Sequence, residues 1–145
     1  MLVCDKIQRS YYSKANFASF FGFGYSTIVV ENSEVKYSSD AKSTSIWIMN
    51  IDGSEQVQLT DAKKGFALNP RWSPDGTRLV FQSSKKDKKD ADLYVIDVDG
   101  NNLTQLTINK SYDGQPYWTT DGYIYFVSDR GNNVGNYQIW RFKYE

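Results

Sequence analysis

A unit of about 46 residues occurs nearly three times in this chain, and this repeat constrains the fold more than any other feature. Residues 45–53 match residues 92–100 without a gap, and residues 70–76 match residues 116–122. Residues 138–142 are a further copy of the start of the first motif. Internal repeats with a period of roughly 20–50 residues are typical of solenoids and propellers, in which each unit packs against its neighbours.

Alternating apolar and polar residues in each repeat predict four short strands. In the central repeat the strands are expected around Trp72 and over residues 78–83, 92–98 and 103–106. Asp–Gly pairs are expected at the turns between them, because glycine accepts a positive φ and aspartate tolerates it. These pairs are Asp52–Gly53, Asp75–Gly76, Asp99–Gly100 and Asp121–Gly122. In a weaker N-terminal copy, Asn32 is expected at the corresponding turn.

Four strands per unit and this period predict the blades of a β-propeller. A helical solenoid has a similar period, but residues 27–145 show no helical periodicity. We therefore expect an all-β chain, a partial β-propeller of about three four-stranded antiparallel blades at about 26–60, 69–107 and 115–145. Because a ring needs at least about four blades to close, the chain would be a fragment of a larger propeller or one of several copies that complete a ring.

The central repeat also carries a family resemblance. Residues 72–76 read Trp-Ser-Pro-Asp-Gly, an apolar strand then ends at Ser83, and Gln-Leu-Thr follows at 105–107. This order resembles the TolB-type propeller repeat, and the resemblance covers about residues 27–145. The C-terminal unit departs from the pattern at residues 119–120, where Thr-Thr replaces the usual Ser-Pro, and the N-terminal unit lacks the tryptophan motif.

The resemblance implies six blades in a complete ring, so that three blades are half of it and either missing blades or self-association would close it. It also implies a non-catalytic module that binds a protein partner, in the bacterial cell envelope and therefore in a periplasmic or other extracytoplasmic location. The alternative that the resemblance implies is the propeller portion of a prolyl-oligopeptidase-type peptidase or of a polysaccharide-processing enzyme.

Composition excludes several kinds of chemistry. The chain has no histidine, which removes the commonest general base and metal ligand, and its only cysteine is Cys4, so neither an intrachain disulfide nor a cysteine zinc site can form. Seventeen basic and 17 acidic residues give a net charge of zero, which argues against nucleic-acid binding. No apolar run approaches the roughly 20 residues that cross a bilayer, and the apolar start is too short for a signal peptide. We expect no catalytic residues, no cofactor and no metal site.

The residues that could carry chemistry recur at fixed positions of the repeat. The aspartates of the Asp–Gly pairs could ligate a metal or transfer protons, but their recurrence at the turns predicts a structural role. Recurring aromatic residues could stack on a sugar or a peptide, and their repetition predicts packing instead. These residues are Trp72, Trp118, Trp47, Tyr94 and Trp140. Residues 85–90 and 129–135 are expected to be solvated loops on one rim.

Residues 1–25 do not fit the repeat. Residues 7–11 could form an outer strand that closes a last blade, and the aromatic residues between 17 and 25 could pack on an open blade face. Weak helical spacing also allows a short helix in this segment. The sequence leaves these alternatives open.

Overall fold

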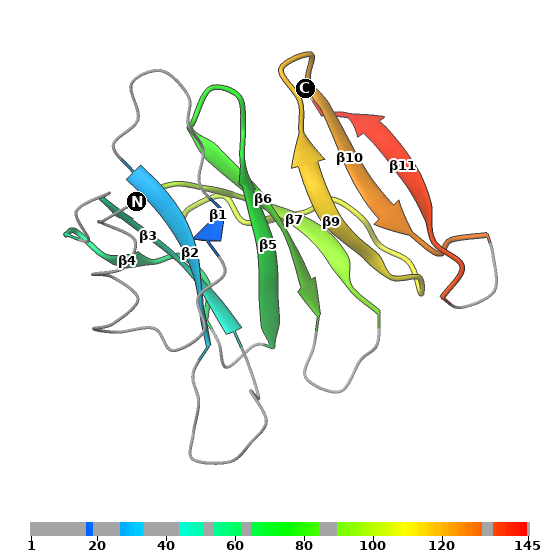
Figure 1. Ribbon diagram of the computed structural model, residues 1–145, viewed down its shortest axis with the longest axis horizontal. Helices are drawn as coiled ribbons and strands as arrows, with labels where there is room; N and C mark the ends of the chain where they lie inside the picture. Colours follow the sequence, from blue (N-terminus) through cyan, green and yellow to red (C-terminus); the bar gives the residue numbers. More distant parts are fainter. Residues whose placement is uncertain are drawn as a thin grey trace.

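The computed structural model describes residues 17–18, 27–33, 44–50, 54–61, 65–84, 90–131 and 135–144, and it describes the first two of these segments by their backbone only. These residues contain eleven strands in three antiparallel sheets and no helix. The sheets follow one another along the chain and stand face to face, as Figure 1 shows. Within these segments there is accordingly no helix with the length and apolar character needed to cross a membrane.

Each sheet is a simple meander, in which strands that are neighbours in sequence are neighbours in space. Sheet 1 contains β1 (Phe17–Ala18), β2 (Thr27–Ser33), β3 (Thr44–Asn50) and β4 (Val57–Gln58). Sheet 2 contains β5 (Phe66–Trp72), β6 (Arg78–Ser84), β7 (Asp92–Asp97) and β8 (Thr104–Gln105). Sheet 3 contains β9 (Asp113–Trp118), β10 (Tyr123–Ser128) and β11 (Gln138–Lys143). The predicted partial β-propeller is therefore confirmed, with each sheet as one blade.

The N-terminal blade differs from the sequence-based expectation. The prediction of a turn at Asn32 is wrong, because Asn32 lies inside β2 and pairs with Ser45 of β3. The run of β-branched residues at 28–30 favours an extended strand through this position, and no glycine follows Asn32 to allow a tight turn. In addition, β1 pairs with β2, so two residues of the unassigned N-terminal segment belong to sheet 1.

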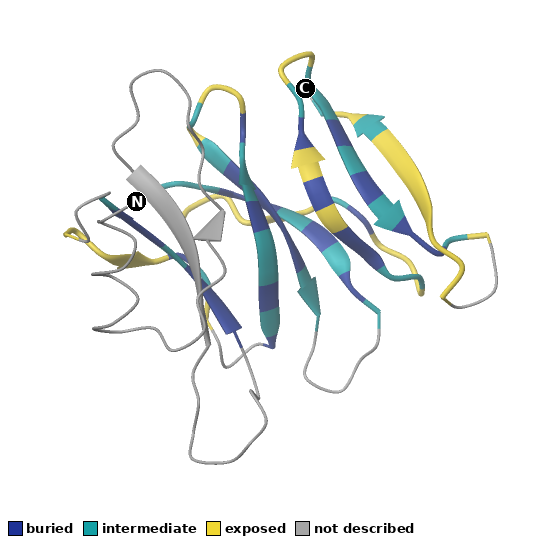
Figure 2. Ribbon diagram, viewed as in Figure 1, coloured by how far each residue is buried: buried dark blue, intermediate teal, exposed yellow. Residues whose placement is uncertain are grey.

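Two apolar layers hold the three sheets together, and alternate residues of the central sheet face opposite layers. Figure 2 shows the buried residues concentrated where the sheets face each other. Between sheets 1 and 2 the buried residues are Ile46, Ile48, Leu59, Ala67, Leu79, Phe81 and Ile96. Between sheets 2 and 3 they are Val80, Leu93, Val95, Trp118, Ile124 and Phe126. Burying such side chains is worth roughly 1.5–3 kcal/mol each, so the layers supply the main force that keeps the blades stacked.

Candidate functional site

The aspartates of the described Asp–Gly pairs act as turn residues. Gly76, Gly100 and Gly122 have φ values of 71°, 85° and 84°, the left-handed region that favours glycine. Each aspartate carboxylate accepts hydrogen bonds from residues two positions away, as Asp75 does from the Ser73 hydroxyl at 2.6 Å. That hydroxyl contributes most to lowering the pKa of Asp75. The pair at residues 52–53 lies outside the described residues.

Replacing the turn aspartate Asp75 with asparagine removes the charge and keeps an acceptor. Because the pKa of Asp75 in the folded chain lies below its ordinary value of 3.8, its ionised form adds stability above about pH 3.8, and this stability is lost as the pH falls through the lowered pKa. We expect Asp75→Asn to lower the free energy of unfolding by about 1 kcal/mol or less at pH 7. The difference from the wild-type chain, measured by urea denaturation, should shrink towards zero as the pH falls through this lowered pKa. A difference that grows in acid would contradict this account.

Three of the five recurring aromatic residues pack between the blades, as their repetition predicts. Trp118 is 8% exposed between sheets 2 and 3, and Trp72 and Tyr94 pack on the layer between sheets 1 and 2. The guanidinium of Arg78 lies 5.3 Å from the centre of the Trp118 ring and so ties β6 to sheet 3. Trp140 is the most exposed of these residues that the structure describes, at 39%.

A polar cluster that the sequence did not reveal lies where the inner strands of sheets 2 and 3 meet. At its centre is Gln82, which is 5% exposed. Its Oε1 accepts hydrogen bonds from Asn69 Nδ2 at 2.9 Å and from the Gln115 backbone N–H at 2.7 Å, and its Nε2 donates to the Tyr112 hydroxyl at 3.0 Å. Asn69 and Gln115 have φ values of 53° and 52° at bulges in β5 and β9. One side chain thus supports both bulges, so the cluster is structural.

An ion pair extends this polar region. Asp113 is fully buried, and its Oδ2 accepts hydrogen bonds from Arg130 Nη2 and from Asn109 Nδ2. The neighbouring Asp129 is 7% exposed and accepts from the backbone N–H of Tyr112 at 2.9 Å. The start of the loop at 129–135 is therefore buried and bonded, and only its remaining described residues fit the predicted solvated loop; residues 85–89 lie outside the described residues.

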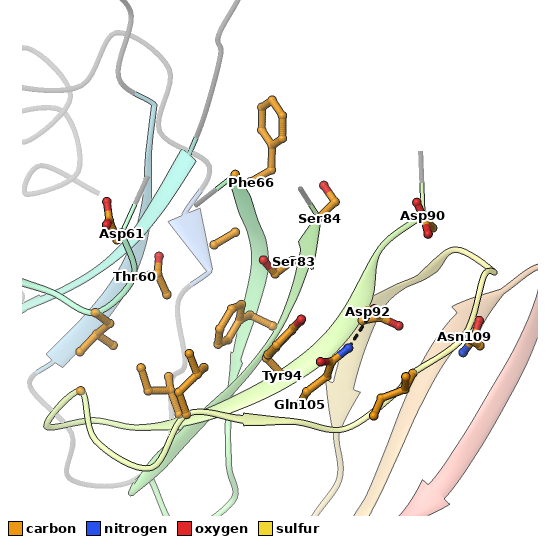
Figure 3. Close-up of a pocket in the computed structure, with 18 residues that line it drawn as sticks. Thr60, Asp61, Phe66, Ser83, Ser84, Asp90, Asp92, Tyr94, Gln105 and Asn109 are labelled. Atoms are coloured by element: carbon orange, nitrogen blue, oxygen red, sulfur yellow. Dashed lines mark hydrogen bonds between the residues drawn. The ribbon is translucent and has the colours of Figure 1, made fainter. Parts of the chain in front are cut away.

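A cavity of about 640 Å³ lies between sheet 2 and the segment that leads into it from sheet 1. Figure 3 shows hydroxyl and carboxylate groups on its walls. Its apolar lining includes Phe81 and Tyr94, whose rings stack with their centres 5.9 Å apart. Asp92 accepts a hydrogen bond from Gln105 Nε2 at 3.0 Å, and burial is the main cause that raises the pKa of Asp92. Burial also raises the pKa of Tyr94, with the Asp92 carboxylate as a second cause.

Two features of the described structure could bind a ligand or a partner. The described segments hold no group of three or more aspartate, glutamate or cysteine side chains placed to ligate a metal ion. A cavity of this size, with an apolar floor and a few polar groups, is typical of ligand sites. The second surface that could bind is the outer face of sheet 3, where Tyr117 is 59% and Ile139 is 78% exposed, and which is open in Figure 2.

Known proteins share this architecture. An uncharacterized peptidase, YuxL, of Bacillus subtilis is 32% identical over 90 residues, which are 62% of this chain and 13% of that protein. The solved structure of a putative TolB from Agrobacterium tumefaciens matches with a TM-score of 0.64 and 20% identity over 81% of this chain and 42% of that one. A puromycin-hydrolyzing peptidase of Mycobacterium tuberculosis matches with a TM-score of 0.65 and 17% identity over 94% of this chain and 23% of that one.

The chain matches only part of each of these proteins. The chain spans 13% and 23% of the length of two curated relatives that it matches. The two solved structures share only the fold with it at 17–20% identity. The family model described as the TolB beta propeller domain, however, matches residues 29–145. The chain therefore belongs to the TolB beta propeller domain family.

Proposed function

We propose that this chain is a non-catalytic propeller module that binds a protein partner. Its family membership, the cavity beside sheet 2 and the exposed face of sheet 3 support this role. The observation that carries the proposal is the structural role of the polar side chains. Those in the described cluster form hydrogen bonds and an ion pair that hold turns, bulges and blades together. The absence of histidine from the whole sequence points the same way.

The proposal is tested by incubating the purified chain with peptide and glycan substrates and, separately, with an extract of bacterial envelope proteins. We expect a specific protein to be retained and no substrate to be turned over. Specific turnover by the chain would overturn the non-catalytic role. A location in the bacterial envelope is part of the same proposal, and cell fractionation with an antibody against the chain tests it.

The second candidate function is the propeller portion of a peptidase. The similarity to YuxL and the match to the puromycin-hydrolyzing peptidase favour it. In that arrangement the propeller would position substrates for a hydrolase domain carried elsewhere in a longer protein. The reading frame around this segment distinguishes the candidates, since a following domain with a Gly-x-Ser-x-Gly motif would favour the peptidase.

The outer face of sheet 3 provides a further prediction. Tyr117 and Tyr125 alternate with the buried residues of β9 and β10, and Ile139 pairs with Val127 of β10, so the three side chains share this face. Exposed apolar surface of this kind favours association, with a further blade or with a second copy of the chain. We expect light scattering at micromolar concentration to show association of the wild-type chain and a marked reduction with Ile139→Lys. Ile108→Lys is the control, because Ile108 is 83% exposed and lines the cavity beside sheet 2, to which no residue of β9, β10 or β11 contributes. A wild-type chain that stays monomeric would contradict the prediction.

A further inference from the structure

The floor of the cavity beside sheet 2 has a counterpart in sheet 3. Phe81 and Tyr94 are paired across β6 and β7, and Phe126 and Trp140 are paired in the same way across β10 and β11. Both pairs occupy the same positions of the repeat and face the preceding blade. The two blades therefore present two aromatic rings at the same repeat positions, and they differ in what lies on these rings.

In sheet 3 a guanidinium group lies on this surface. The Cζ atom of Arg130 is 4.9 Å from the centre of the Phe126 ring and 5.4 Å from that of the Trp140 ring. Arg130 Nη2 forms the ion pair with Asp113, and Nε donates to the Ser128 hydroxyl at 3.1 Å. Sheet 3 thus shows which group this surface accepts. The group is a planar cation that stacks on aromatic rings and forms hydrogen bonds at its edge.

In sheet 2 the equivalent space is the cavity. Ala67 stands at the repeat position of Asp113, and Ser83 stands at that of Ser128. Both line the cavity together with Phe81 and Tyr94, so four of its lining residues match the four that surround the Arg130 guanidinium. The repeat position of Arg130 is held by Lys85, which lies outside the described residues.

The charges of the described lining residues fit a cation as well. Its acidic lining residues are Asp61, Asp90 and Asp92, and no arginine or lysine occurs among the described lining residues. Asp92 pairs with Ser83 across β7 and β6 and lies two residues before Tyr94, so all three line the same face of the sheet, as Figure 3 shows. These carboxylates can replace the carboxylate of Asp113, because Ala67 holds the repeat position of Asp113 in sheet 2.

We propose that the cavity beside sheet 2 binds the guanidinium group of an arginine side chain on a protein partner. This proposal rests on the proposed function and names the chemistry by which the partner is recognised. Arginine suits the site better than lysine, because its planar and weakly hydrated head stacks on rings and donates in a fixed fork to carboxylates. The volume of about 640 Å³ accommodates one such side chain with part of its backbone.

The test measures binding of a short peptide, acetyl-Gly-Gly-Arg-Gly-Gly-amide, to the whole chain by calorimetry and by amide shifts in NMR spectra. The control peptide carries citrulline, which has the shape of arginine without its charge. We expect roughly tenfold weaker binding of the citrulline peptide, and a similar loss for the arginine peptide with Asp92→Asn and with Tyr94→Leu. Equal binding of both peptides, or shifts confined to residues away from Ser83 and Tyr94, would overturn the proposal.

A second variant fills the cavity instead of removing its walls. The double substitution Ala67→Asp with Lys85→Arg rebuilds the arrangement of sheet 3, and we expect it to abolish binding of the arginine peptide while the chain stays folded, as judged by its thermal unfolding. Binding that appears only after Lys85→Ala would show that Lys85 occupies the cavity, and would overturn the proposal. A natural partner that still binds the rebuilt chain would also overturn it, and would leave the proposed interaction role intact.

Discussion

Replacing Arg130 with alanine is expected to lower the free energy of unfolding by about 3 kcal/mol, because it leaves a buried carboxylate without its counter-charge. Asp113 is fully buried, and its second oxygen, Oδ1, has no hydrogen-bond partner among the residues that the structure describes. Without Arg130, the only donor to its side chain within the described segments is Asn109 Nδ2 at 2.8 Å. Urea denaturation followed by tryptophan fluorescence measures the effect.

The two halves of this ion pair are expected to differ in cost. The Arg130 side chain is 31% exposed, so in Asp113→Ala its charge can turn towards water, and we expect a loss of only about 1–2 kcal/mol. The double variant Asp113→Ala with Arg130→Ala should be more stable than Arg130→Ala alone, since it no longer buries an uncompensated charge. A double variant whose loss equals the sum of the two single losses would refute this explanation.

The same pair shows why part of the site was hidden from the sequence. A repeated pattern indicates the structural features that all units share. The alternating strands and the Asp–Gly turns are therefore predictable from residues such as Asp75 and Asp121. The ion pair occurs in a single described blade, and Ala67 replaces Asp113 in the central one. A feature present in one copy carries no periodic signal, and a lone aspartate and a lone arginine 17 positions apart resemble ordinary surface residues.

The cavity and the polar cluster depend on distances that no local pattern encodes. In the sequence Gln82 is an ordinary alternating residue of a strand. In the structure its side chain bonds to the bulge in β5 of its own sheet and to the bulge in β9 of the next sheet. The rings of Phe81 and Tyr94 line a cavity because the segment that leads from sheet 1 lies at a distance from sheet 2, and the sequence does not encode this distance locally. The prediction of a turn at Asn32 is wrong for a related reason. The weak repeat resembles the others at its polar residues, whereas its β-branched residues favour a continuous strand.

Replacing Gly114 with alanine is expected to destabilise the chain by about 2–3 kcal/mol, because the site has no room for one more carbon atom. A Cβ at this position would lie 2.5 Å from the Tyr112 hydroxyl oxygen and 2.6 Å from Gln82 Oε1. Either side chain could swing away in isolation. Here they hydrogen-bond to each other, and Gln82 Oε1 also accepts from the Gln115 backbone, so movement would leave buried polar groups unpaired.

Gly100→Ala is the matched control for this prediction. Gly100 has a φ of 85° and no atom within 4 Å of an added Cβ, so its replacement costs only the backbone strain of about 1 kcal/mol. Tyr112→Ala removes one of the two clashing side chains, and in that background Gly114→Ala should cost at least 1 kcal/mol less than in the wild-type chain. Chemical denaturation of the four variants measures both comparisons. If Gly114→Ala costs no more than Gly100→Ala, the close contact among Gly114, Tyr112 and Gln82 does not limit the packing of sheets 2 and 3.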